Sequence, residues 1–248
     1  MKQKLQLNAN HLKLIAIIAM TLDHVCDLIW PGFPMEPGAM GLHILGRLTA
    51  PIMWFFVCEG YYYTHNVKKY MLRMGIFAII SHFAYCFSFG MNPIPFSTGF
   101  FNQTSVMYPL FIAVLVMWIR DSDLPVKNWV KNVLIGVLII SAFPADWSCI
   151  AVLAILEMYK RRGNLKAQMK EMIVYVAIYA VISFLFVSKG YAIAQIGVLL
   201  VYPVLAQYNG QKGKVKWMKW FFYLYYPAHL VIIGVLRILI YGNVSLLF

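Results

Sequence analysis

Hydrophobic residues gather in nine runs along the chain, separated by short polar connections. The first run is about 20 residues long, the length that a helix needs to cross a hydrocarbon core about 30 Å thick. We therefore predict an all-α fold: a polytopic integral membrane helical bundle with about nine transmembrane helices, in a single domain over 1–248. The runs cover residues 11–31, 43–65, 68–89, 104–120, 127–144, 147–159, 169–188, 190–207 and 217–241.

Composition supports a membrane protein. The chain is 62% hydrophobic and 12% charged, whereas a soluble domain usually has about 45–50% apolar and about 25% charged residues. The first run carries charge in its interior, and no small-residue cleavage site follows it. We therefore predict that it is a transmembrane helix and not a removable signal peptide.

The net charge of +12 follows the predicted topology. Connections 31–42, 90–104 and 143–147 contain no Lys or Arg, whereas the alternate connections are basic. This positive-inside pattern predicts a cytoplasmic N-terminus, and it explains the basic charge without nucleic acid as a partner. The basic residues at or beside these alternate connections and the N-terminus are Lys2, Lys4, Lys68, Lys69, Arg73, Arg120, Lys127, Lys131, Lys160, Arg161, Arg162, Lys166, Lys170, Lys212, Lys214, Lys216 and Lys219.

The stretch "MTLDHVCD" (20–27) places ionisable residues inside the first run. Such residues are rare within membrane spans and are functional candidates by default. The predicted direction of this helix places Asp23 and His24 in its outer half and Lys13 near the cytoplasmic face. Lys13 and His24 are eleven residues apart, about three turns or 16 Å, so both point the same way.

Five ionisable residues from separate segments share one predicted depth: Asp23, His24, Arg47, His82 and Asp146. An imidazole with a pKa near 6.5 can take a proton, a carboxylate can orient it, and an arginine can balance developing negative charge. These five are the candidate catalytic residues.

Purely structural roles remain open for two of the five. His82 could simply hydrogen-bond between helices, and Arg47 could only neutralise Asp23 or Asp146. Outside this set, Asp27 and His43 are expected to be solvated near the interface, and Glu59 to pair with Lys68 or Lys69.

Two further features bear on the site. Residues 90–105 form a long connection without basic residues, which we interpret as a lid over an outward-facing cavity or as a plain surface loop. The four cysteines have no zinc-binding spacing and are expected to pack as small apolar residues, so no metal site is predicted. GxSxG, HExxH and P-loop motifs are absent.

Five blocks of sequence, taken together and in order, resemble the TraX family. They are "LKLIAIIAMTLDH" (12–24), "GRLTAPIMWFFVCEGYYYTHNVKKYMLRM" (46–74), "SH" (81–82), "FPADWS" (143–148) and "AQYNGQKGK…KWFFYLYYPAHL" (206–230). The family consists of bacterial inner-membrane proteins and includes the N-acetyltransferase of conjugative pilin. The resemblance implies a multi-span acyltransferase that uses cytoplasmic acetyl-CoA.

The resemblance also implies roles for single residues. His24 would be the catalytic histidine, Asp23 its companion, and Lys13 the basic residue that precedes it, where many members have Arg. Arg47, Asp146 and His229 fall in matched blocks without an assigned role, and His82 and Trp147 depart from the residues expected there. Basic and amide groups at the cytoplasmic rim could hold the phosphates of CoA: Lys13, Lys68, Lys69, Arg73, Asn209 and Lys212.

Three hypotheses follow for function. The first is an acetyltransferase of the bacterial cytoplasmic (inner) membrane, with His24 as general base and direct transfer to a peptide or pilin N-terminal amine, or to a sugar hydroxyl, at the outer face. The second is a transporter or channel with a proton or ion relay through Asp23, His24, Arg47 and His82, although no internal repeat supports it. The third is a non-enzymatic assembly factor, which predicts that replacing His24 leaves function intact.

Overall fold

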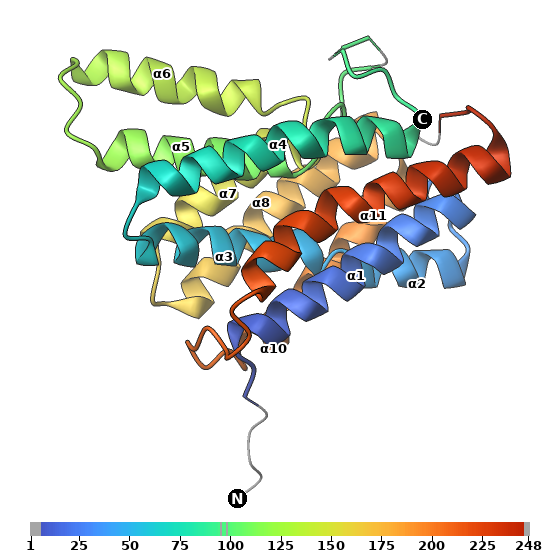
Figure 1. Cartoon of the computed structure of the whole chain (residues 1–248), viewed down its shortest axis with the longest axis horizontal. Coiled ribbons are helices and arrows are strands. Elements are labelled where there is room, and N and C mark those ends of the chain that lie inside the picture. Colours follow the sequence, from blue (N-terminus) through green and yellow to red (C-terminus); the bar gives the residue numbers. More distant parts are fainter. Residues whose placement is uncertain (1–5, 95, 98, 246–248) are drawn as a thin grey trace, which may run out of the picture.

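The computed structural model describes residues 6–94, 96–97 and 99–245, apart from the side chain of Lys219, so Lys2 and Lys4 lie outside the described residues. The described chain is all-helical and contains no strands beyond two isolated bridges (Figure 1). Its elements are α1 (Ala9–Ile29), α2 (Pro37–Gly46), α3 (Thr49–Tyr63), α4 (Val67–Phe89), α5 (Met107–Asp121), α6 (Asn128–Ser141), α7 (Ser148–Lys160), α8 (Leu165–Phe186), α9 (Lys189–Ala194), the 3-10 helix η1 (Gln195–Leu200), α10 (Val201–Leu205) and α11 (Met218–Tyr241).

Each predicted hydrophobic run corresponds to one helix or to consecutive helices, but the structure does not support the count of nine spans. In the described chain, four stretches are long and apolar enough to cross a membrane: Pro37–Tyr63, Val67–Phe89, Leu165–Phe186 and Trp220–Tyr241. Helices α5, α6 and α7 have 15, 14 and 13 residues, and they therefore extend only about 20–23 Å. The run at 190–207 is divided among α9, η1 and α10.

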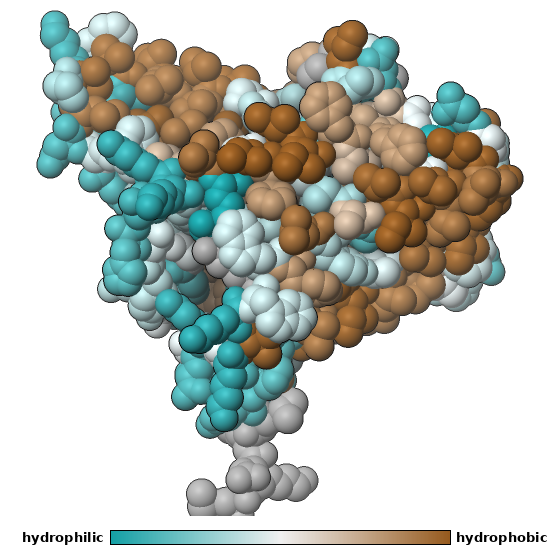
Figure 2. All heavy atoms as spheres, in the orientation of Figure 1, coloured by the Kyte–Doolittle hydropathy of each residue, from teal (hydrophilic) through white to brown (hydrophobic). Residues whose placement is uncertain are grey.

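Polar residues gather at one end of the bundle. The α3–α4, α5–α6 and α7–α8 connections and the segment before α11 lie toward the left and bottom of Figure 1, and Figure 2 shows hydrophilic side chains concentrated on the same side. The α1–α2 connection and the end of α11 lie at the opposite end. Apolar side chains cover much of the rest of the visible face, as expected for helices that contact lipid.

The N-terminal segment is held by the glycine-rich connection before α11. Leu7 pairs with Tyr208, and Asn10 Nδ2 donates to the Val215 carbonyl at 3.2 Å. Gly213 has φ +83° and approaches Asn10 so closely that a Cβ atom would overlap it. Gly213 therefore has a packing role at the start of α1, whatever else this segment does.

Helix α1 has α2, α3 and α11 as packing neighbours, while α4 packs against both α5 and α11. A two-residue interruption at Arg47 and Leu48, which we call the α2–α3 corner, separates α2 from α3. The corner, the α6–α7 turn and the C-terminal half of α1 come together deep in the bundle, and this arrangement positions the candidate site.

Candidate functional site

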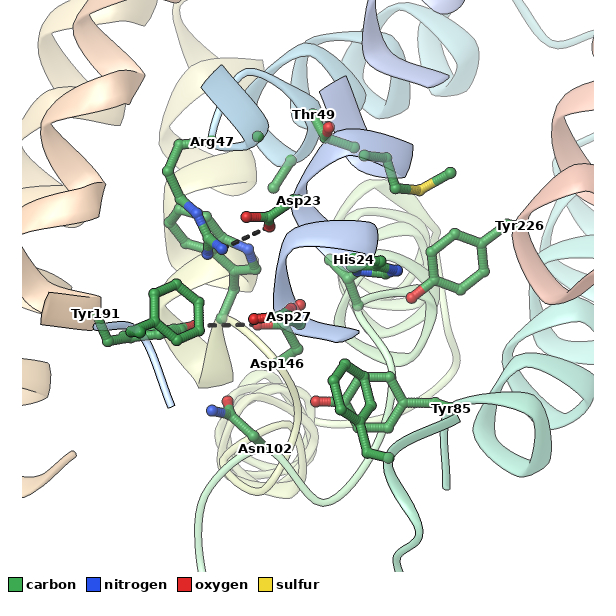
Figure 3. A pocket seen from close by; sticks show the side chains of 17 residues that line it. Asp23, His24, Asp27, Arg47, Thr49, Tyr85, Asn102, Asp146, Tyr191 and Tyr226 are labelled. Atoms are coloured by element: carbon green, nitrogen blue, oxygen red, sulfur yellow. Dashed lines mark hydrogen bonds and ion pairs between the residues drawn. The ribbon is translucent and has the colours of Figure 1, made fainter. Parts of the chain in front are cut away.

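A cavity of about 60 Å³ lies against the C-terminal half of α1 (Figure 3). This volume accommodates on the order of a few water molecules. Four of the five candidate catalytic residues line it, and His82 does not. The polar residues of its wall are Asp23, His24, Asp27, Arg47, Thr49, Tyr85, Asn102, Asp146, Tyr191 and Tyr226.

Asp23 is the centre of a buried network. Its Oδ2 accepts a hydrogen bond from Arg47 NH2 at 2.6 Å, and its Oδ1 accepts one from His43 Nδ1 at 2.9 Å. Asp23 and Arg47 are only 8% and 5% exposed, and His43 is fully buried. A buried ion pair is tolerated where its remaining polar atoms are also bonded, and His43 meets that requirement for Asp23.

The close approach of α1 to the α2–α3 corner depends on Gly46. A Cβ atom at this position would overlap the side chain of Asp23. Any larger residue would therefore push α1 away from the corner and separate Asp23 from Arg47.

Aromatic rings surround the Arg47 guanidinium. Its central carbon lies 5.3 Å from the Tyr191 ring centroid, 5.5 Å from that of Phe33 and 5.9 Å from that of Trp147. These separations allow cation–π attraction. Among the described residues, Arg47 Nε has no hydrogen-bond partner. The side chain therefore keeps an unused donor next to the cavity.

His24 faces a different side of α1 from Asp23. Figure 3 shows its ring turned toward Tyr226 and away from Arg47. His24 Nδ1 lies 3.0 Å from His229 Nε2, and the two rings stack with centroids 5.1 Å apart. Asp23 does not hydrogen-bond to His24 in this structure: its oxygens bond to His43 and Arg47, and His229 contacts His24 instead. The role of Asp23 as the companion of His24 stays a prediction.

A strained turn presents Asp146. Trp147 and Ser148 have φ angles of +65° and +51°, a region that costs a non-glycine residue about 1–3 kcal/mol. Trp147 stacks on Tyr179 at 5.1 Å, and Tyr191 donates a hydrogen bond to Asp146 Oδ1 at 3.4 Å. Burial raises the pKa of the Asp146 carboxyl to about 6, against the smaller lowering effect of Arg47.

His82 anchors the loop that follows α4. Its Nε2 donates to the Pro93 carbonyl at 2.8 Å, and its Nδ1 lies 2.9 Å from Thr104 Oγ1. His82 does not line the cavity, so the sequence prediction that groups it with the cavity residues is corrected here. The loop itself does reach the cavity, because Asn102 lines the wall next to the strained turn.

Three environments differ from those expected. His43 and Asp27 are buried at 0% and 8% exposure and are not solvated. Glu59 pairs with Arg162 at 2.8 Å. His43 and Arg47 are four residues apart, and residues i and i+4 lie on one helical face. This spacing indicates that His43 faces the same site as Arg47.

The candidate CoA contacts lie outside the cavity. Lys13 lies over the Phe56 ring at 5.4 Å, and the Arg73 guanidinium lies 5.4 Å from the Tyr223 ring centroid on α11. Lys68, Lys69 and Lys212 are exposed. Asn209 Oδ1 accepts a hydrogen bond from the Gln211 backbone at 3.0 Å. Their contact with CoA stays a prediction.

Comparison with known proteins gives a family match and a relative. A family model described as "TraX protein" matches residues 8–237. A protein of Dichelobacter nodosus named "Probable fimbrial assembly protein FimC, serogroup H1" is 31% identical over 247 residues, covering 94% of this chain and 97% of that protein. No solved structure matches the chain.

Proposed function

The chain belongs to the TraX family, and from this premise we propose that it is an integral-membrane acetyltransferase. It moves an acetyl group from cytoplasmic acetyl-CoA to an acceptor on the outer side of a bacterial inner membrane. The observation that carries the proposal is His24 in the wall of a buried cavity with Arg47, Asp23 and Asp146. An imidazole, an arginine donor and carboxylates are suited to acyl transfer.

Acetyl-CoA supplies the acetyl group as a thioester. His24 takes a proton from the attacking amine or hydroxyl as the new bond to the acetyl carbon forms, and then gives a proton to the departing sulfur. Arg47 Nε, which has no partner in the described structure, donates to the acetyl oxygen as negative charge develops there. The products are the acetylated acceptor and free CoA.

The size of the cavity limits how the donor binds. A volume of about 60 Å³ has room for an acetyl group but not for CoA. The phosphates therefore lie nearer the basic end of the bundle. The groups proposed to hold them are Lys13, Lys68, Lys69, Arg73, Asn209 and Lys212, because cationic and amide donors bind phosphate oxygens.

The proposed acceptor is the N-terminal amine of a peptide or fimbrial subunit, and a sugar hydroxyl is the alternative. The name of the Dichelobacter nodosus relative supports a fimbrial role. The basic connections lie at one end of the bundle, which supports a cytoplasmic position for that end. The cavity then lies toward the outer side, where an exported acceptor can enter.

An ion relay has less support from the geometry. The relay requires His82, and that side chain is bonded to Pro93 and Thr104 outside the cavity wall. A non-enzymatic assembly role would give no function to the half-buried His24 or to the Arg47 Nε donor, which has no partner among the described residues.

Purified protein in detergent, incubated with radiolabelled acetyl-CoA and a host membrane extract, tests the proposal. We expect label to enter one acceptor species, with release of free CoA that depends on that extract. Mass spectrometry of the labelled species then distinguishes a peptide amine from a glycan hydroxyl. If a folded protein gave no labelled product and released no CoA, that result would contradict an acetyltransferase.

A further inference from the structure

A chain of hydrogen bonds leads from His24 to the backbone of α11. His24 Nδ1 lies 3.0 Å from His229 Nε2, and His229 Nδ1 lies 3.0 Å from the Tyr225 carbonyl oxygen. The rings of Tyr225 and His229 stack with an interplanar angle of 7°. His229 is 5% exposed, so its ring orientation is fixed by packing as well as by hydrogen bonds.

This chain determines where the protons reside. A carbonyl oxygen only accepts, so His229 Nδ1 carries a hydrogen and donates it to Tyr225. In neutral His229 the other nitrogen, Nε2, is then an acceptor, and His24 Nδ1 must supply the hydrogen between the two rings. His24 Nε2 is consequently left with a free lone pair.

A charged His229 would reverse this arrangement. It would donate from Nε2 to His24 Nδ1, and neutral His24 would then hold its hydrogen on Nε2. No ion pair between His229 and a carboxylate is recorded in the described part of the chain. The ring is packed against Tyr225, Tyr226 and His24, so the buried environment favours the neutral form.

We propose that His229 is a positioning residue that holds His24 in the Nδ1–H tautomer, with Nε2 unprotonated. This inference rests on the proposed function, since it gives His24 the lone pair that a general base needs. When His24 accepts the proton of the acceptor, its Nδ1–H bond to His229 persists and stabilises the imidazolium. In this proposal His229, and not a carboxylate, orients the imidazole of His24.

The tautomer can be measured without any activity assay. In protein labelled with nitrogen-15 histidine, NMR distinguishes protonated from unprotonated ring nitrogens, and His24→Gln and His229→Gln identify the two sets of signals. We expect neutral His24 to have Nδ1 protonated and Nε2 unprotonated. A hydrogen on His24 Nε2 near neutral pH would overturn the inference while leaving acetyl transfer itself untouched.

Kinetics supply the second readout. His229→Phe keeps an aromatic ring but removes the acceptor, and we expect kcat to fall about 100-fold or more, because loss of the group that fixes the tautomer of a catalytic imidazole can cost on the order of 10⁴-fold. His229→Gln places an amide oxygen within reach of His24 Nδ1 and should recover most of that loss. The KM for acetyl-CoA should change little in either variant.

The exposed His65 provides the matched control, and His65→Phe should behave as wild type. Thermal unfolding of each variant separates a folding defect from a catalytic one. Equal loss of kcat in folded His229→Phe and His229→Gln would contradict a positioning role. Wild-type rates in both would also contradict it.

Discussion

Asp23 is the residue on which the buried charges of the cavity converge. One carboxylate oxygen accepts from Arg47 and the other from His43, and all three side chains are almost fully removed from solvent. Single replacement of either ionic partner leaves the other charge buried without compensation, which costs about 3–5 kcal/mol. Replacing both removes that problem.

We therefore expect Asp23→Asn and Arg47→Met each to lower the thermal midpoint strongly, whereas the double variant is less destabilised than the sum of the two. Thermal unfolding in detergent measures this coupling. Lys160→Met provides a surface control, since its pair with Glu157 is half-exposed and is worth at most about 1 kcal/mol. Additive effects of the two buried substitutions would contradict a direct ionic contact.

Sequence reasoning at the residue scale found Asp23, His24, Arg47 and Asp146, because charge inside an apolar run is conspicuous. It placed His43 and Asp27 in solvent because both lie near helix ends, where burial depends on tertiary packing. It did not connect His24 with His229, since a sequence separation of 205 positions gives no local pattern to follow.

At the scale of helices, the contact between α1 and the α2–α3 corner decides whether the cavity forms. Gly46→Ala should separate Asp23 from Arg47, because the added Cβ atom would overlap Asp23. We expect a lower thermal midpoint and a rate of acetyl transfer at least 10-fold below that of the wild type. Gly41 lies in the same helix and faces open space. Gly41→Ala should be neutral or stabilising by up to about 1 kcal/mol. Equal behaviour of the two variants would contradict the close approach.

The turn between α6 and α7 leads to a pH prediction. Burial raises the pKa of Asp146 from 3.8 to about 6, so the folded protein binds this proton more tightly than the unfolded chain. The resulting stability is complete below about pH 4 and is lost as pH rises through about 6. The thermal midpoint of the wild type should therefore fall between pH 5 and 7.5 relative to that of Asp146→Asn. Parallel curves for the two proteins would contradict this shift.

Hydrophobic runs predicted where helices lie because burial and lipid contact both select apolar residues. They did not predict where a run is interrupted. The break at Arg47 and Leu48 and the division of 190–207 into α9, η1 and α10 arise from packing against α1 and α8, which the local pattern does not record. The count of nine spans is unsupported for the same reason.

For the whole molecule, the distribution of basic connections predicts which end faces the cytoplasm. Met35 in the α1–α2 connection and Asp123 in the α5–α6 connection are exposed, and these two connections lie at opposite ends of the bundle in Figure 1. In a Cys149→Ser background, we expect a membrane-impermeant thiol reagent added to intact spheroplasts to label Met35→Cys but not Asp123→Cys, and lysis to expose the second site. Labelling in the reverse order would place the N-terminus outside.

The central claim is that the cavity at His24 transfers acetyl groups, and paired histidine substitutions test it most directly. Initial rates of radiolabelled acetyl transfer from acetyl-CoA to the host acceptor would be compared for wild type, His24→Gln and His82→Gln. We predict a loss of about 100-fold or more in His24→Gln, and a rate within a few-fold of wild type in His82→Gln, because His82 anchors a loop outside the cavity wall. Undiminished transfer by folded His24→Gln would contradict the account.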